Sequence, residues 1–196
     1  MSFVELIPIA LLGGVLGLDV VSFPQAMVSR PLVAATLAGV LVGQPASGLL
    51  IGAALELVAL ETLPFGASRY PEWGSAAVVG GAIYAANPAP SAGAMSLGVL
   101  SALATTWVGG WTMVKLRQWN ALWAARKREA LEAGARGAVI SLQLGGMTAD
   151  LARGILLTAI AYTLLQPLAA WCIAHWTIDN RLSRAIVVAG YEAPAS

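Results

Sequence analysis

Residues 30–66 read RPLVAATLAGVLVGQPASGLLIGAALELVALETLPFG, and their pattern is the most specific indication of how the chain folds. It holds two apolar segments, Leu32–Val42 and Gly48–Leu63, on either side of a Gly-Gln-Pro turn at 43–45. Both segments are shorter than the roughly 20 residues that a membrane-crossing helix needs. Short, Gly- or Pro-interrupted apolar segments indicate broken helices, which survive at membrane depth only inside protein or along a cavity. We therefore expect a re-entrant helical hairpin here.

The composition agrees with a membrane protein. The chain has 196 residues, of which 58% are hydrophobic and only 11% are charged. Soluble domains carry roughly 25% charged residues, so these side chains could not cover a soluble globule of this size. The composition excludes an ordinary cytosolic enzyme, a disordered chain and a nucleic-acid binder. The length allows about six crossings at roughly 20 residues each.

Three stretches outside the broken region are long enough to span a membrane alone: Phe3–Ser22, Ala92–Val114 and Leu151–Ala174. Gly74–Ala86 is a further short apolar segment. The sequence therefore predicts an all-α, polytopic membrane protein, with full-length transmembrane helices and short, broken or re-entrant helical hairpins. We expect one membrane domain over residues 1–196.

One stretch, residues 115–137, has the composition of a soluble segment. It contains six of the eleven basic residues of the chain, so the positive-inside rule places it in the cytoplasm. We interpret it as a basic amphipathic loop whose residues 118–133 form a helix. That helix could dock a cytoplasmic partner or lie on the membrane interface, and we favour the interface.

Glu56 is the most informative polar residue, because apolar residues surround it on both sides. A carboxylate at a helix centre in lipid costs about 2.5 to 3.5 kcal/mol on insertion scales, so it must face protein or a cavity. It could accept hydrogen bonds from the hydroxyls of a sugar. The alternative is a helix–helix contact with Arg30 or Arg153. Gln25 and Ser29, in the proline-broken stretch before Pro31, could supply further donors and acceptors.

Other chemistry is weakly supported. His175 and Cys172 lie three apart near a tryptophan pair, and metal binding needs more ligands than that. The sequence has no nucleotide-binding, hydrolase or metalloprotease motif. We expect no cofactor, no metal and no catalytic residue.

The order of Arg30-Pro31-Leu32, Leu37-Ala38-Gly39, Leu55-Glu56 and Phe65-Gly66-Ala67 resembles a known family. It is similar to the membrane IIC component of the mannose/fructose/sorbose family of the bacterial phosphoenolpyruvate-dependent sugar phosphotransferase system. Pro71-Glu72 resembles the family's proline–acid pair. Residues 140–153 resemble its polar segment with an arginine, and residues 186–191 are weakly similar to its C-terminal part.

The resemblance implies a subunit of the bacterial inner membrane that carries a hexose-type sugar together with a IID subunit, as part of an oligomer. Cytoplasmic IIA and IIB phosphocarriers would supply the phosphate. Sugar contacts would map onto Gln25 and Glu56, with Ser29 and Gly66 as further candidates. The chain departs from the family at Pro24 and Pro64, where an acid and an asparagine are usual, and it is shorter than the usual IIC.

Two other functions remain open. The chain could be a non-transporting structural or regulatory subunit that keeps the IIC fold, which the departures and the short C-terminus favour. It could also be a small substrate-binding membrane subunit of another importer, although that class does not explain the Arg-Pro and Leu-Glu spacing. A membrane enzyme is the least supported class.

Overall fold

The computed structural model describes residues 3–19, 22, 25–61, 70–87 and 92–175. Helices joined by turns and irregular segments make up this part of the chain, in the order α1 (Phe3–Asp19), α2 (Pro31–Leu41), α3 (Pro45–Glu61), α4 (Trp73–Ala85), α5 (Ala92–Arg126), α6 (Arg128–Glu132) and α7 (Arg136–His175). The expected all-α class is confirmed.

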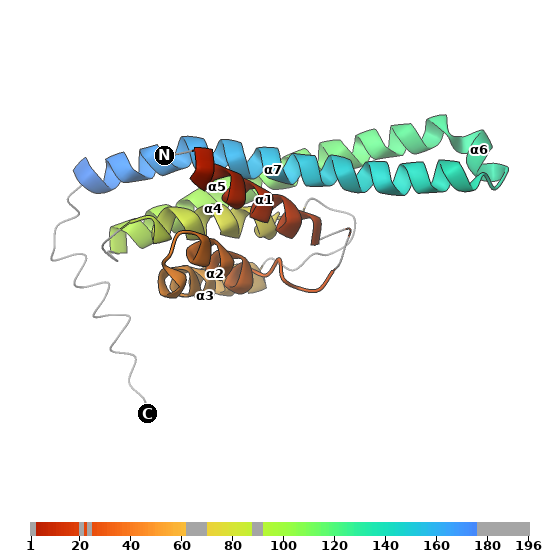
Figure 1. Cartoon of the computed structure of the whole chain (residues 1–196). Helices are drawn as coiled ribbons and strands as arrows, with labels where there is room; N and C mark the ends of the chain where they lie inside the picture. The colour runs from red at the N-terminus through yellow and green to blue at the C-terminus, as the bar shows by residue number, and fades with distance from the viewer. Residues whose placement is uncertain (1–2, 20–21, 23–24, 62–69, 88–91, 176–196) are drawn as a thin grey trace, which may run out of the picture.

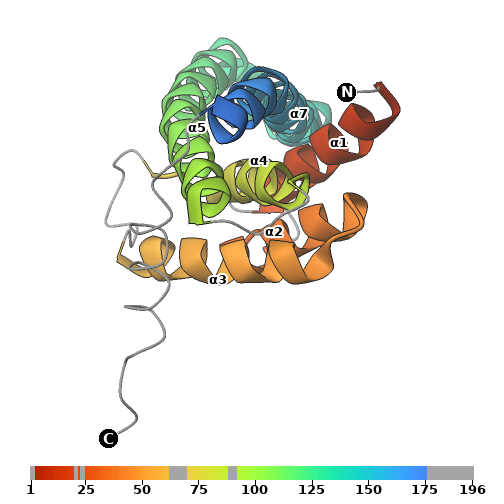
Figure 2. The same cartoon turned by 90° about the vertical axis from the view of Figure 1, so that its left-hand side faces the viewer.

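The helices pack in layers around α4 (Figures 1 and 2). α5 and α7 lie side by side as a long hairpin with α6 at its tip, and α1 packs along α7. α2 and α3 form a second, shorter hairpin on the opposite side of α4. Every residue from Gly74 to Ala85 is buried, so α4 is the central helix of the core.

The α2–α3 hairpin forms as the sequence predicted. Pro31 begins α2 and Pro45 begins α3, where proline's missing N–H costs nothing, and Gly43 takes the turn at φ 81°. A Cβ on Gly39 would lie 2.8 Å from the Cα of Gly48. The two glycines therefore let the backbones of α2 and α3 touch, as small residues do in membrane helix pairs.

Two of the described helices are long and apolar enough to cross a membrane, over Gly93–Arg126 and Arg136–His175. The expectation that Phe3–Ser22 also spans alone stays a prediction, because α1 is described over 17 residues from Phe3 to Asp19, and residues 1–2 and 20–21 lie outside the described part of the chain. At 1.5 Å per residue α1 is about 26 Å long, shorter than the roughly 30 Å hydrocarbon core.

The stretch 115–137 differs from the predicted loop with its own helix over 118–133. α5 continues without a break to Arg126, a short helix follows, and α7 already begins at Arg136. The reason is that Trp119 and Trp123 stack on one another one helical turn apart, and Trp123 packs against Gly145 of α7. Pairing with α7 therefore extends the helix beyond its apolar part. The segment forms the far end of the α5–α7 hairpin (Figure 1).

Candidate functional site

The break between α1 and α2 is organised by Asp19, which is 2% exposed. Its carboxylate accepts the backbone N–H of Ala26 at 2.8 Å and that of Ser29 at 3.0 Å. Gln25 and Met27 adopt left-handed backbone, at φ 58° and 62°. Such conformations in residues other than glycine cost about 1–3 kcal/mol each and persist only when the surroundings hold them. Asp19 supplies that restraint.

Glu56 bridges α3 to the start of α2. Its Oε1 lies 2.7 Å from the Nη2 of Arg30, and its Oε2 accepts the backbone N–H of Leu32 at 3.1 Å. The carboxylate thus caps the N-terminus of α2, where the helix dipole favours negative charge. Of the two helix-contact partners considered for Glu56, the structure selects Arg30.

This ion pair can also contact a ligand. The Arg30 side chain is 46% exposed and that of Glu56 is 18% exposed. Each carboxylate oxygen has a second lone pair, and the guanidinium carries five N–H donors. A ligand with two neighbouring hydroxyl groups can therefore donate to Glu56 from one and accept from Arg30 at the other.

The structure places three of the four predicted site residues in one region. Gln25 lies exposed in the broken segment, and Ser29 follows it, half-buried and hydrogen-bonded through its amide to Asp19. Ser29 is adjacent in the chain to Arg30, which holds Glu56. Gly66 and Pro64 lie outside the described residues, as do Pro24 and the C-terminal residues 176–196.

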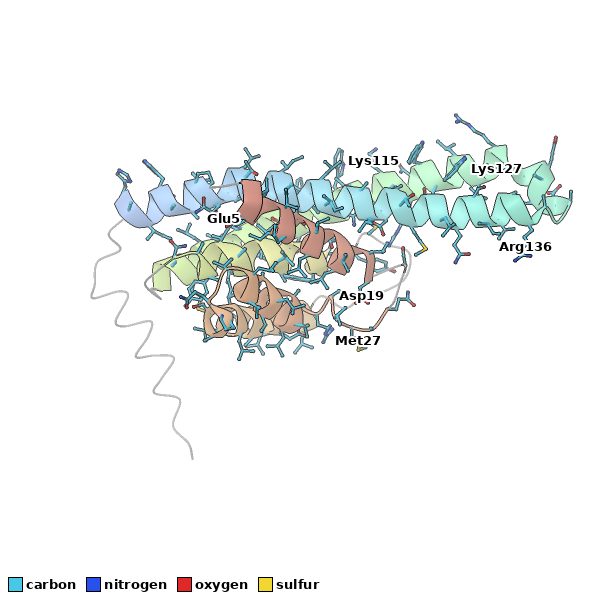
Figure 3. All side chains as sticks on the ribbon, in the orientation of Figure 1. Glu5, Asp19, Met27, Lys115, Lys127 and Arg136 are labelled. Atoms are coloured by element: carbon cyan, nitrogen blue, oxygen red, sulfur yellow. The ribbon has the colours of Figure 1, made fainter. Side chains whose placement is uncertain are left out.

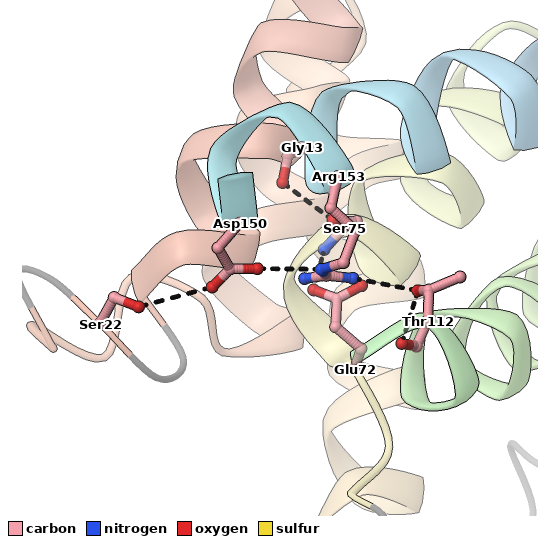
Figure 4. Close-up of polar contacts among 8 residues, drawn as sticks. Gly13, Ser22, Glu72, Ser75, Thr112, Asp150 and Arg153 are labelled. Atoms are coloured by element: carbon pink, nitrogen blue, oxygen red, sulfur yellow. Dashed lines mark hydrogen bonds and ion pairs between the residues drawn. The ribbon is translucent and has the colours of Figure 1, made fainter. Parts of the chain in front are cut away.

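A buried polar cluster between α1, α4, α5 and α7 was not predicted (Figure 4). Arg153 of α7 contacts Asp150 at 2.9 Å and donates to the hydroxyl of Thr112 on α5 at 3.4 Å. Glu72, 2% exposed, accepts the backbone N–H of Ser75 at 3.0 Å and so caps the start of α4. The Ser75 hydroxyl in turn donates to the carbonyl of Gly13 in α1 at 2.9 Å.

Two atoms of this cluster, Oε2 of Glu72 and Nη2 of Arg153, are buried and have no hydrogen-bond partner among the described residues. A Cβ on Gly17 would lie 3.2 Å from Oε1 of Glu72 and 3.8 Å from Nη2 of Arg153. Glycine at this position therefore leaves α1 close to both charges. The sequence had drawn attention to both residues, Glu72 through the Pro71-Glu72 pair and Arg153 through the polar segment that ends with it. Their separation in the chain, however, does not indicate that they lie in one cluster.

The arrangement is that of a membrane transport protein, with short broken helices packed against long spans and charged residues at the breaks. Residues 3–195 match the family model described as the sorbose-specific IIC component of the phosphotransferase system. This chain belongs to that family.

Solved structures share the fold. A chain of the mannose transporter ManYZ, determined by cryo-electron microscopy in complex with microcin E492, has a TM-score of 0.69 at 19% identity, covering 98% of this chain and 75% of that one. A chain described only as a membrane protein has a TM-score of 0.72 at 20% identity, covering 97% and 78%. No curated protein matches the chain.

Proposed function

We propose that this IIC component binds a hexose-type sugar and translocates it across the bacterial inner membrane together with a IID subunit. The observation that carries the proposal is the Arg30–Glu56 pair, 2.7 Å apart and partly exposed beside the broken segment. The family membership supports it, because the sorbose-specific description of the matching model names a sugar.

In this mechanism the pair binds two neighbouring hydroxyls of the sugar. Glu56 accepts from one hydroxyl and Arg30 donates to the other, while Gln25 and Ser29 contact the sugar from the broken segment. Broken helices of this kind line the substrate sites of secondary transporters.

The phosphate chemistry in this proposal belongs to cytoplasmic IIA and IIB phosphocarriers, and phosphorylation traps the sugar by adding charge. α5 is about 52 Å long at 1.5 Å per residue, against a hydrocarbon core of roughly 30 Å. Its end therefore extends well past the lipid if its apolar part spans. In this proposal the positive-inside rule puts that basic end in the cytoplasm, on the side of the membrane where the phosphocarriers act.

The test is binding of radiolabelled D-mannose and L-sorbose to the purified protein, alone and in complex with a IID subunit. We expect saturable binding that Glu56→Gln weakens at least about tenfold, because the neutral amide loses the ion pair and one acceptor position. Glu129→Gln, on the exposed far end of the hairpin, is the matched control and should bind as the native chain does.

Two results would contradict the proposal. A stable complex with IID that binds neither sugar at millimolar concentration would instead support the non-transporting subunit. Equal sugar affinity in Glu56→Gln and the native chain would remove Glu56 from the site.

A further inference from the structure

A polar pocket lies between α5 and α7, next to the buried cluster, with which it shares Asp150. Its volume is 260 Å³. Five of its lining residues carry polar or charged side chains: Ser22, Arg117, Asn120, Gln143 and Asp150. Two methionines and a leucine complete its apolar walls. Pockets for drug-sized ligands run from about 300 to 1,000 Å³, so this one suits a smaller molecule.

The polar groups of the pocket are positioned by the fold. Asp150 is 3% exposed, is held by Arg153 at 2.9 Å, and faces the hydroxyl of Ser22 at 3.5 Å. The guanidinium of Arg117 stacks over the ring of Tyr70, 5.2 Å from its centroid. Such preorganised side chains lose little conformational freedom when a ligand binds.

Asn120 is the residue that points to a ligand. Its amide oxygen is buried and accepts no hydrogen bond from the described residues. A buried acceptor left unpaired costs about 1–3 kcal/mol. Turning the amide over would bring this oxygen to the side of Gly146, which lines the pocket and where Nδ2 now lies, and a donor from a ligand there would recover that loss. The amide of Gln143 on α7 lines the same pocket, and an amide both donates and accepts.

We propose that this pocket is a second sugar subsite that takes a single hexose. The amides of Asn120 and Gln143 and the carboxylate of Asp150 would bind its hydroxyls, and the side chains of Met113 and Met147 would pack on its C–H face. A hexose offers the many donors that an amide oxygen and a carboxylate need. The inference rests on the proposed function, since it gives the same sugar a second position.

The place of the pocket suits the cytoplasmic end of a transport path. Arg117 and Asn120 come directly after the apolar part of α5, where the basic segment begins. Ser22 belongs to the segment between α1 and α2 that also carries Gln25 and Ser29.

The test is photoaffinity labelling of the full chain, in complex with a IID subunit, by a diazirine derivative of mannose, with the labelled peptides mapped by mass spectrometry. We expect label within residues 113–123 or 141–150 that excess mannose prevents. Asn120→Leu and Gln143→Leu should each reduce it at least about tenfold, since each leaves sugar hydroxyls unpaired.

Gln118→Leu is the matched control, because residue 118 lies on the same helix but is exposed and points about 200° away from residue 120. Gly146→Ala is the variant least able to disturb folding. Its Cβ would lie 3.5 Å from Nδ2 of Asn120, alanine favours the helix, and the added methyl occupies the pocket and should lower labelling.

Label confined to residues 22–32 or 52–60, lost in Glu56→Gln but unchanged in Asn120→Leu, would overturn the second subsite and leave the proposed function standing. Label at residues 113–123 that survives in Glu56→Gln and falls in Asn120→Leu would support the subsite even if Glu56 has no role. Equal labelling in Asn120→Leu and Gln118→Leu would overturn it.

Discussion

The carboxylate of Asp19 accepts the backbone N–H of Ala26 at 2.8 Å, across the break between α1 and α2. Figure 3 shows Asp19 at the end of α1, with Met27 further along the segment that leads to α2. One buried side chain therefore holds two backbone amides of the segment that joins α1 to α2. The same segment carries Gln25 and Ser29, so the shape of the predicted sugar site depends on Asp19.

We predict that Asp19→Ala loosens this segment with only a modest loss of global stability. Removing the acceptor leaves the amides of Ala26 and Ser29 without their partner, but both hydrogen bonds are only part-buried. Water therefore replaces much of the lost interaction, and the left-handed residues relax. Limited proteolysis should cut within residues 20–30 at least about tenfold faster, and sugar affinity should fall. Glu129→Gln should digest as the native chain does. Unchanged cleavage in Asp19→Ala would contradict the restraint.

The helices could be predicted because their signals are local. Pro31 and Pro45 begin α2 and α3, and the apolar lengths set α4 and the spans. Most of the helix predicted over 118–133 is present, but its first part continues α5 instead of forming a helix of its own, because the prediction did not consider the partner helix. The stacking of Trp119 on Trp123, and the contact of Trp123 with Gly145, keep α5 helical beyond its apolar part.

The site was only partly predictable, for a related reason. Glu56 was identified because a lone carboxylate among apolar residues requires a partner, and Arg30 was one of two candidates. Glu72 and Arg153 are 81 positions apart in the sequence, and nothing in their local surroundings indicates that they meet. The role of Asp19 could not be predicted either, because its partners are backbone amides, which every residue except proline provides.

Arg153 should be the most sensitive charged residue of the core. Its side chain is 9% exposed and pairs with Asp150, while Glu72 lies in the same cluster. Removing one partner of a buried pair costs about 3–5 kcal/mol, because the other charge remains uncompensated. Arg153→Met should therefore strongly lower the thermal unfolding temperature in detergent, and Arg153→Met with Asp150→Asn should recover part of the loss.

Arg128→Met gives the control for that prediction. Arg128 forms an ion pair with Glu132 at 2.7 Å, a distance similar to that of the Arg153–Asp150 pair, but both of its side chains are mostly exposed. Exposed pairs contribute about 0–1 kcal/mol, so this variant should melt close to the native chain. If Arg153→Met and Arg128→Met melt alike, the buried cluster is not structurally important.

Gly39 should be required for the α2–α3 hairpin. Its Cβ would lie 2.8 Å from the Cα of Gly48, and 2.7 Å from the carbonyl oxygen of Gln44. Backbone atoms cannot move aside as a flexible side chain can, so Gly39→Ala must separate the two helices. We expect a clear loss of thermal stability. Gly137→Ala, where a Cβ would meet nothing within 4 Å, should be neutral or gain up to about 1 kcal/mol. Equal melting temperatures would contradict the tight contact.

The last prediction concerns the basic end of the α5–α7 hairpin. Arg126 and Arg136 are exposed there, and the region from 115 to 137 holds six basic residues against Glu129 and Glu132. If an acidic phosphocarrier docks on this surface, long-range attraction speeds its association and salt weakens that effect. Reversing both arginines to glutamate should therefore slow association at low salt by about tenfold or more. Surface plasmon resonance with the purified IIB subunit measures this rate across ionic strengths.

Glu129→Gln should associate as fast as the native chain or faster. An association rate that neither salt nor the charge reversals change would place the docking surface elsewhere. Loss of binding to anionic vesicles in the reversed variant, with IIB association intact, would instead assign the basic end to the membrane surface.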